Sequence, residues 1–350
     1  MTLTRRGKWT AAAATVAVLA VTAVLILAIT GRGPAFIQQT AAKVGLADPP
    51  PPPPTCPLTG EPAPHGVIPH RPVLAVKVEN LPEARPQAGL EGADVVYEEP
   101  VEGGITRFMV LFQCHDANRV GPVRSGRTTD PGILVQYGKP LLGYAGGANE
   151  VVKAIDRAGL VDVNYLVAAK AYVRDPNRLA PHNLYTSTKR LYAAGKSKDG
   201  APDPAFTYGD EIEGKSRRTR TVHLDFSSSS DVYWKWDRGD GVWYRSHGDV
   251  PHTLENGDQV SAANVVVQVV NVQTGSIIDA AGNPSPDVGL TGSGKAYVFR
   301  DGRMIAGKWI RDTLDDVTEF VITRAGKEIP LSPGVTWVEL LPAGIRVDVA

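Results

Sequence analysis

The sequence predicts an α+β protein, in which a mixed α/β N-terminal domain precedes a small, mostly β C-terminal domain, and one transmembrane helix precedes both. Three observations support this fold class. Residues 9–30 are uncharged, strand and helix patterns alternate between 57 and 206, and short strand patterns separated by turn residues fill 221–350. A chain of 350 residues is long enough for two domains after such an anchor.

The domain boundaries follow changes in composition. Proline, glycine and charged residues mark two linkers, and apolar patterns mark the folded parts. We predict a cytoplasmic N-terminus at 1–8, a transmembrane anchor at 9–30, a proline-rich extracytoplasmic linker at 31–56, the mixed α/β domain at 57–206, a second linker at 207–220 and the all-β domain at 221–350.

The N-terminal apolar run predicts the location of the protein. At about 1.5 Å per residue, a helix over 9–30 spans the roughly 30 Å hydrocarbon core of a bilayer. Arg5, Arg6 and Lys8 precede the run, so we expect a single-pass cell-membrane protein with its N-terminus inside and its body extracytoplasmic. A cleaved signal peptide is the alternative, but "AITG" matches an A-x-A cleavage site poorly. No cysteine closely follows the run, so lipid attachment there is not expected.

The proline run at 49–54 predicts a stiff, extended spacer between the membrane and the folded body. Cys56 and Cys114 are the two cysteines of the chain. In an oxidising compartment they most simply form a disulfide, with two buried free thiols as the alternative. Two cysteines do not supply the ligands of a structural zinc site, and we expect no metal.

The predicted elements of the first domain include three strands, at 73–80, 93–100 and 107–114. A helix with Asn149 as its N-cap is expected to stop at Gly159, and a second helix is expected within 182–195.

The strand patterns of the second domain predict a small sandwich or barrel of short strands. "RDGR" at 300–303 predicts a hairpin with a type I′ turn at Asp301–Gly302. Its tryptophans allow two interpretations, a hydrophobic core or a platform that binds carbohydrate; they are Trp234, Trp236, Trp243 and Trp309.

Charge and motifs exclude two classes of partner. Lys plus Arg equals Asp plus Glu, at 37 each, which gives no sign of nucleic-acid binding. The segment 289–296, "GLTGSGKA", resembles a nucleotide-binding loop. However, Ala296 stands where the loop needs Ser or Thr, and a strand pattern follows instead of a helix. We therefore expect no nucleotide and no cofactor.

Polar residues gather in three loops of the first domain, each after a predicted strand. They are Glu98 and Arg107; Arg124, Ser125 and Arg127; and Arg174, His182 and Asn183. Guanidinium groups bind phosphate or carboxylate through paired hydrogen bonds, and histidine exchanges protons near neutral pH. These residues are the predicted ligand-binding set, with His182 the candidate catalytic residue. The alternative is structural: arginine–glutamate pairs join loops, and His182 or Asn183 caps a helix.

At these residues the chain resembles the YerB-like family of bacterial envelope proteins, often lipoproteins. The likeness rests on "RPQAGLEGADVVYEEPVEGGITRF", "RVGPVRSGR" and "RLAPHNLYTST" in the first half, and on "YRSHGDVPHTLENGDQVSAANVVVQ", "GSGKAYVFRDGRMIAGKW" and "LSPGVTWVELLP" in the second. It implies a membrane-attached, surface-exposed protein built from two domains of unknown function. The family pattern carries a histidine near the position of Tyr144, which this chain lacks.

Two hypotheses of function follow. The first is a binding module for an anionic envelope ligand or a partner protein, such as a cell-wall polymer or a cell-wall synthesis protein, in cell-wall assembly or its regulation. The second is a hydrolase or transferase acting on a phosphate-containing envelope polymer, with His182 as general acid and base. Convergence of Arg107, Arg124 and His182 in one cleft favours the enzyme, whereas pairing of the arginines with Glu98 or Glu99 favours a structural role. A scaffold without a small ligand is the third option.

Overall fold

The computed structural model describes residues 52–350 other than 198, 212–213, 280–281 and 323–325, together with the single residues 23, 27, 40 and 43. The chain divides into two compact units, Met1–Pro53 and Pro54–Ala350. The predicted anchor at 9–30 falls almost entirely outside the described residues, and so does most of the linker. In the described part of the chain, no helix is long and apolar enough to cross a membrane.

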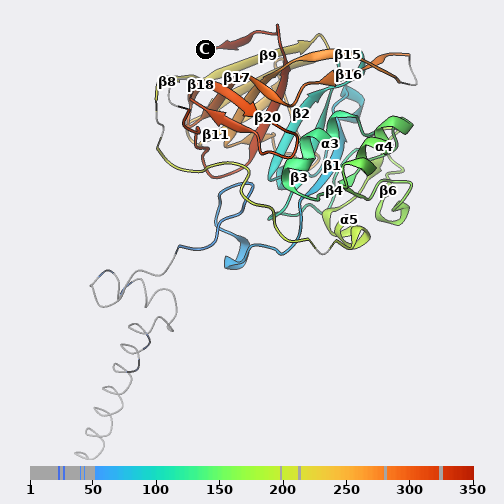
Figure 1. Cartoon of the computed structure of the whole chain (residues 1–350), viewed down its shortest axis with the longest axis horizontal. Coiled ribbons are helices and arrows are strands. Elements are labelled where there is room, and N and C mark those ends of the chain that lie inside the picture. The colour runs from blue at the N-terminus through green and yellow to red at the C-terminus, as the bar shows by residue number, and fades with distance from the viewer. Residues whose placement is uncertain are drawn as a thin grey trace, which may run out of the picture. The chain divides into compact units, whose positions relative to one another are not determined.

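The second unit contains helices and strands along its whole length (Figure 1). Its described elements are η1 (Pro64–Gly66), β1 (Leu74–Glu79), η2 (Pro82–Ala84), η3 (Leu90–Gly92), β2 (Val95–Pro100), η4 (Glu102–Gly104), β3 (Thr106–Phe112), α3 (Thr129–Leu134), η5 (Val135–Tyr137), β4 (Leu141–Gly143), α4 (Asn149–Arg157), β5 (Val161–Asp162), η6 (Ala169–Ala171), β6 (Val173–Arg174), β7 (Leu184–Tyr185), α5 (Thr188–Gly195), β8 (Ser216–Arg218), β9 (Thr221–Ser227), β10 (Ser230–Asp237), β11 (Val242–His247), β12 (Val250–Pro251), β13 (Ser261–Ala262), β14 (Asn264–Val270), β15 (Val272–Ile278), β16 (Pro284–Val288), β17 (Gly292–Arg300), β18 (Arg303–Arg311), β19 (Glu319–Val321), β20 (Thr336–Pro342) and β21 (Val347–Val349).

One large sheet runs through both halves of the sequence. Its strand order is β19-β18-β17-β14-β20-β2-β3-β1-β4-β5, with β8 beside β18. Strand β20 of the second half pairs in parallel with β2 of the first, so the halves share backbone hydrogen bonds. A smaller antiparallel sheet has the order β12-β11-β10-β9-β21, with β13 beside β11. The predicted mixed α/β first half and largely antiparallel second half are confirmed, whereas the division into two domains at 207–220 stays a prediction.

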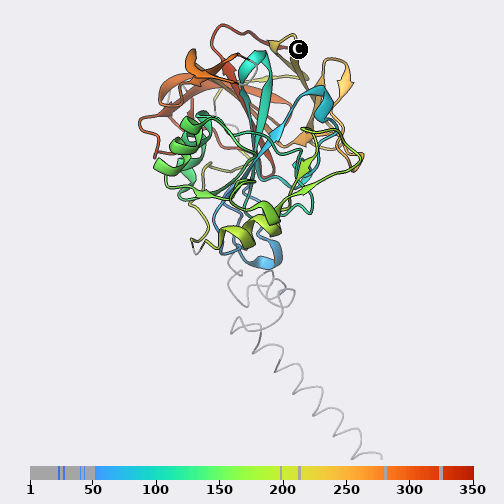
Figure 2. The same ribbon diagram turned by 90° about the vertical axis from the view of Figure 1, so that its right-hand side faces the viewer.

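The two faces of the large sheet carry separate cores. Because side chains alternate along a strand, Val76 and Val78 of β1 join one core, while Ala75 joins the other. The first core includes Trp234 and Trp243 of the smaller sheet, which therefore belong to the interior. The second core packs against α3 and α4, which lie beside the strands of the first half (Figure 2). Strands covered on both faces explain why β1 and β3 are buried throughout.

Several local predictions are confirmed, and others are wrong. Asp301 and Gly302 both have positive φ, at 50° and 65°, as a type I′ turn requires. Helix α4 begins at Asn149, but its N-cap is the preceding residue Ala148, so Asn149 is not the cap. The helix predicted within 182–195 begins only at Thr188.

The start of this helix is capped by Ser187, whose side chain accepts a hydrogen bond from the backbone N–H of Arg190 at 3.3 Å. Neither His182 nor Asn183 caps it, because the chain first forms strand β7. Sequence patterns predicted no helix at Thr129–Leu134, where α3 forms, so the differences are not confined to element boundaries.

The predicted disulfide is present. Cys56 and Cys114 are joined with an S–S distance of 2.09 Å and a Cα–Cα distance of 5.9 Å. The bridge ties the start of the folded body to the residues that follow β3, across 58 positions of sequence.

Candidate arginine-lined binding site

A row of charged residues crosses one end of the large sheet. In register, Glu79 of β1 lies opposite Arg107 of β3, and Arg107 lies opposite Glu99 of β2. All three therefore project from the same face, the one that carries α3 and α4 farther along. Next to the row on the same face, the buried Lys77 of β1 donates to Asp130 of α3 at 2.6 Å, so the core beside the row also contains charges.

Glu79 joins two of the predicted site residues. Its Oε1 lies 3.0 Å from Arg124 Nε, in an ion pair that lacks hydrogen-bond geometry, and its Oε2 lies 2.9 Å from His182 Nδ1. The backbone N–H of Arg124 donates to the carbonyl of Lys77 at 2.9 Å, which fixes the loop against β1. The structure thus brings Arg124 and His182 to one carboxylate, neither Glu98 nor Glu99.

Arg107 and Arg127 complete the group of guanidiniums. Arg107 Nη1 donates to the carbonyl of Ser125 at 3.1 Å, and Arg127 Nε donates to Glu102 Oε2 at 2.8 Å. Burial first, and then the positive charge of Arg127, lower the pKa of Arg107 to about 9. Arg107 is 6% exposed, and its Nε has no hydrogen-bond partner.

These residues line a cavity of about 500 Å³, which we call the arginine cavity. Its lining residues are Glu102, Arg107, Arg124, Ser125, Arg127, Gly147, Ala148, Val151, Ile277, Ile278, Asp279 and Ser285. One wall carries the guanidiniums, and the other combines the start of α4 with isoleucines of β15. The volume is in the range of small-molecule sites, about 300–1,000 Å³.

The arginines, not their carboxylate partners, form the exposed side of each pair. The side chain of Arg124 is 23% exposed and that of Glu79 only 1%; the values for Arg127 and Glu102 are 12% and 4%. Glu102 is also held by the hydroxyl of Ser285, which donates to its Oε1. The carboxylates therefore hold the guanidiniums in place from behind, and the lining carries three guanidiniums against two carboxylates, those of Glu102 and Asp279.

Arg174, His182 and Asn183 do not line the arginine cavity, and His182 is joined to Arg124 only through Glu79. Arg174 Nη1 donates to Asn183 Oδ1 at 2.8 Å, and its guanidinium lies over the ring of Tyr165 at 5.4 Å. The amide of Asn183 donates to the carbonyls of Asp175 and Arg178. These contacts order the loop that carries His182, and they pair the two residues with each other.

Glu98 lies on the opposite face of the sheet, fully buried. Arg245 Nη2 of the smaller sheet donates to both of its oxygens, at 3.0 and 2.7 Å. Its register partner on β20 is Glu339, whose pKa is raised well above the usual value by burial and by the charge of Glu98. This group of buried charges, which we call the inter-sheet ion cluster, contributes no surface to the arginine cavity.

One partner of the site, Glu79, was missed by sequence reasoning. A signal for Glu79 existed: a charged residue at the end of a fully buried strand pattern needs a partner, because an unpaired buried charge is unfavourable. Which residue provides that partner depends on long-range pairing. No group of three or more His, Cys, Asp or Glu residues able to hold a metal occurs among the described positions.

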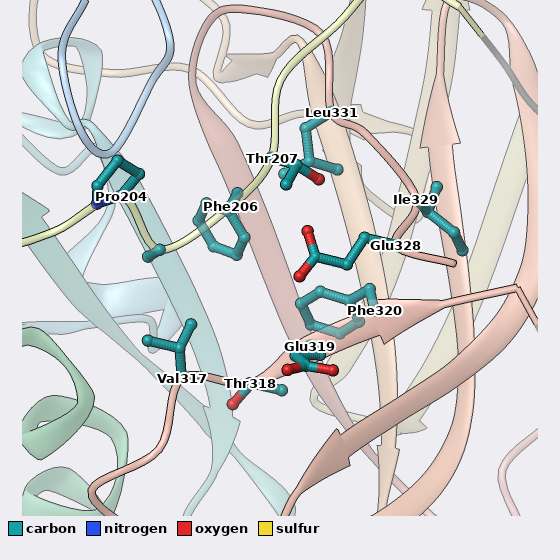
Figure 3. Close-up of a pocket in the computed structure, with 11 residues that line it drawn as sticks. Pro204, Phe206, Thr207, Val317, Thr318, Glu319, Phe320, Glu328, Ile329 and Leu331 are labelled. Carbon is teal, nitrogen blue, oxygen red and sulfur yellow. The ribbon is translucent and has the colours of Figure 1, made fainter. Parts of the chain in front are cut away.

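A second cavity, of about 210 Å³, has the opposite character (Figure 3). It lies between the segment 204–207 and β19, and the rings of Phe206 and Phe320 stack there at 6.4 Å. Glu319 and Glu328 line it, and Glu328 extends toward the two rings (Figure 3). Its described lining residues include no lysine or arginine, so it does not suit an anion.

Two family descriptions match this chain, one in each half of the sequence. Residues 58–201 match the family described as "Protein of unknown function (DUF3048) N-terminal domain", and residues 222–338 match its "C-terminal domain". The chain belongs to this family, which confirms the expected YerB-like relationship.

A particular relative and a solved structure agree with this assignment. The "Putative lipoprotein YerB" of Bacillus subtilis (strain 168) is 30% identical over 303 residues, which cover 82% of this chain and 86% of the relative. The crystal structure of YerB protein from Bacillus subtilis matches with a TM-score of 0.72 and 27% identity, covering 84% of this chain and 99% of that one.

Proposed function

We propose that this protein is a membrane-attached envelope protein whose arginine cavity binds an anionic group of an envelope polymer, or of a partner in cell-wall synthesis, in cell-wall assembly or its regulation. Convergence of Arg107, Arg124 and Arg127 on one cavity is the observation that carries the proposal. Membrane attachment is supported by the apolar run at 9–30 and by the relative named as a lipoprotein. The body then faces envelope polymers outside the membrane.

The chemistry of the cavity favours phosphate or carboxylate. A guanidinium offers several N–H donors in a fixed plane, which matches the oxygens of these anions. The guanidiniums of Arg124 and Arg127 each pair with one carboxylate, whereas Arg107 donates to a backbone carbonyl. The three positive charges also repel one another, and a bound anion relieves that repulsion. An anion therefore adds negative charge beside three guanidiniums.

Thermal unfolding of the full-length chain tests anion binding. Inorganic phosphate and poly(glycerol phosphate) are expected to stabilise the wild type, by about 2.7 kcal/mol where the ligand exceeds its Kd by about a hundredfold. Arg124→Gln is expected to abolish most of this stabilisation, because it removes the most exposed of the paired guanidiniums. Arg346→Gln is the matched control, since Arg346 pairs with Asp348 on β21 and does not line the cavity. A wild type that neither anion stabilises contradicts the proposal.

A second candidate function, hydrolysis or transfer at a phosphate-containing polymer, is favoured by one contact. The carboxylate of Glu79 lies 2.9 Å from His182 Nδ1, an arrangement that fixes the ring and leaves Nε2 to exchange protons. In the described residues, Nε2 has no hydrogen-bond partner. Arg124 is close enough to share the same carboxylate.

The histidine variant separates the two functions. If the protein is an enzyme, His182→Gln is expected to reduce release of glycerol phosphate from the polymer by about 10²–10⁴-fold, the usual contribution of general acid–base catalysis. The thermal stabilisation by the polymer is expected to remain. A wild type without turnover, or a variant with unchanged turnover, contradicts the enzyme and leaves the binding module.

A further inference from the structure

The smaller sheet has one face buried against the large sheet and one face whose side chains are half-exposed or exposed. Along β10, Val232 and Trp234 are fully buried, whereas Tyr233 is half-exposed and Lys235 exposed. Strand β11 repeats the alternation. The inward residues pack against the large sheet, and the outward residues form a surface of their own.

Two tyrosines stand on this outward face at a fixed separation. The register pairs Tyr233 with Ser246 and Lys235 with Tyr244, so the two rings are diagonal neighbours. The Tyr233 ring stacks on His223 with centroids 4.1 Å apart and planes 7° apart. The Tyr244 hydroxyl donates to Asp240 at 2.8 Å. The Tyr233 ring is thus held by His223 and the Tyr244 ring by Asp240, and the two tyrosine rings do not stack on each other.

A cavity of about 430 Å³ lies at the tyrosines, on the same face. Its rim carries both donors and acceptors of hydrogen bonds, from Ser246, Gln259, Lys235 and the carboxylates of Asp237 and Asp249. Of the two interpretations of the tryptophans, the core holds for Trp234, Trp243 and Trp309, which are buried; Trp236, which is half-buried, contributes to the lining of the cavity.

We propose that this cavity, the tyrosine cavity, binds an uncharged sugar ring of a glycan. A pyranose ring has C–H groups on its faces and hydroxyls at its edge. Tyrosine rings offer apolar faces to the former, and the polar rim offers partners to the latter. The lining contains the carboxylates of Asp237 and Asp249 but only one ammonium, that of Lys235. The tyrosine cavity is therefore unfavourable for anions, in contrast to the arginine cavity. This inference does not depend on the proposed anion binding.

Isothermal titration of the full-length chain with uncharged oligosaccharides tests the inference. The probes are maltohexaose, cellohexaose and tetra-N-acetylchitotetraose, each at millimolar concentration. At least one is expected to bind the wild type. Tyr244→Ala is expected to weaken that binding by at least about tenfold, or ~1.4 kcal/mol, because it removes one stacking surface. Tyr244→Phe keeps the ring and is expected to bind nearly as well as the wild type.

Two results would overturn the inference. The first is the absence of binding by all three oligosaccharides. The second is unchanged affinity in both Tyr233→Ala and Tyr244→Ala, with the circular dichroism spectrum showing that both variants are folded. If a lysine-rich peptide binds and none of the three sugars does, the inference is also overturned. The acidic rim is then a site for a cationic partner instead.

Discussion

Arg245→Met is expected to destabilise the folded body by about 3–5 kcal/mol, the usual effect of breaking a buried ion pair by removing one partner. Arg245 is fully buried, donates to both oxygens of Glu98, and lies 2.8 Å from His252 Nδ1 through Nη1. Without it, Glu98 and Glu339 remain side by side in the interior without the guanidinium that donates to Glu98. Denaturant unfolding at neutral pH measures the loss.

The loss of stability in Arg245→Met is expected to depend on pH in a defined direction. The pKa of Glu339 is already raised, so the folded state holds its proton to higher pH than the unfolded chain does. A raised carboxyl pKa contributes stability that is present below the unfolded value, about 4.3, and is lost as pH rises above it. Removing the arginine is expected to strengthen this trend. The stability lost in Arg245→Met, relative to the wild type, should therefore be smallest near pH 4.

A matched double variant separates charge from packing. Arg245→Met combined with Glu98→Gln removes the uncompensated charge and is expected to recover part of the lost stability. A loss of less than about 1 kcal/mol in Arg245→Met at neutral pH contradicts the role assigned to the inter-sheet ion cluster.

Opening the Cys56–Cys114 disulfide is expected to destabilise the body by about 4 kcal/mol. The bridge spans 58 positions of sequence, and the chain-entropy relation gives a loss of this size for a loop of such length. Both cysteines are buried, so exposure of the thiols requires at least local opening. Unfolding of the variant Cys56→Ala/Cys114→Ala, compared with the oxidised wild type, measures the loss.

Reductant supplies the control for the disulfide. Added during unfolding, it is expected to bring the wild type close to the stability of the double alanine variant and to leave that variant unchanged. Equal stability of the oxidised wild type and the variant shows that the bridge does not restrain the unfolded chain.

Local features of the fold were predictable because they depend on neighbouring residues. Asp301–Gly302 adopts the positive φ angles that its turn type requires, and Gly159, with φ of 68°, follows the end of α4. The helix boundary at Thr188 was missed because "HNLY" first forms β7, which is stabilised by pairing with β6. A local pattern does not show whether a distant strand is available.

Long-range contacts of the fold could not be predicted from the sequence. The parallel pairing of β2 with β20 joins residues more than 200 positions apart in sequence, and Glu98 meets Arg245 across 147 positions. Glu98 was grouped with the loop cluster because it is close in sequence, but its side chain points to the opposite face from Glu99. A shift of one residue along a strand changes the face.

For the candidate site, the sequence singled out the arginines but not what holds them. Arg107, Arg124 and Arg127 line one cavity, while Arg174 pairs with Asn183 elsewhere. Their meeting depends on register and loop geometry. Whether the cavity binds an anion stays a prediction.

Isothermal titration of the full-length chain with poly(glycerol phosphate), at low and at raised salt, tests the central claim most directly. We predict that the wild type binds and that salt weakens the binding, because the contacts are charged. We also predict that Arg124→Gln and Arg107→Gln, both folded, bind at least about tenfold more weakly, or ~1.4 kcal/mol. Equal affinity of the wild type and both variants, or no binding at either salt concentration, would contradict the assignment of the arginine cavity as an anion site.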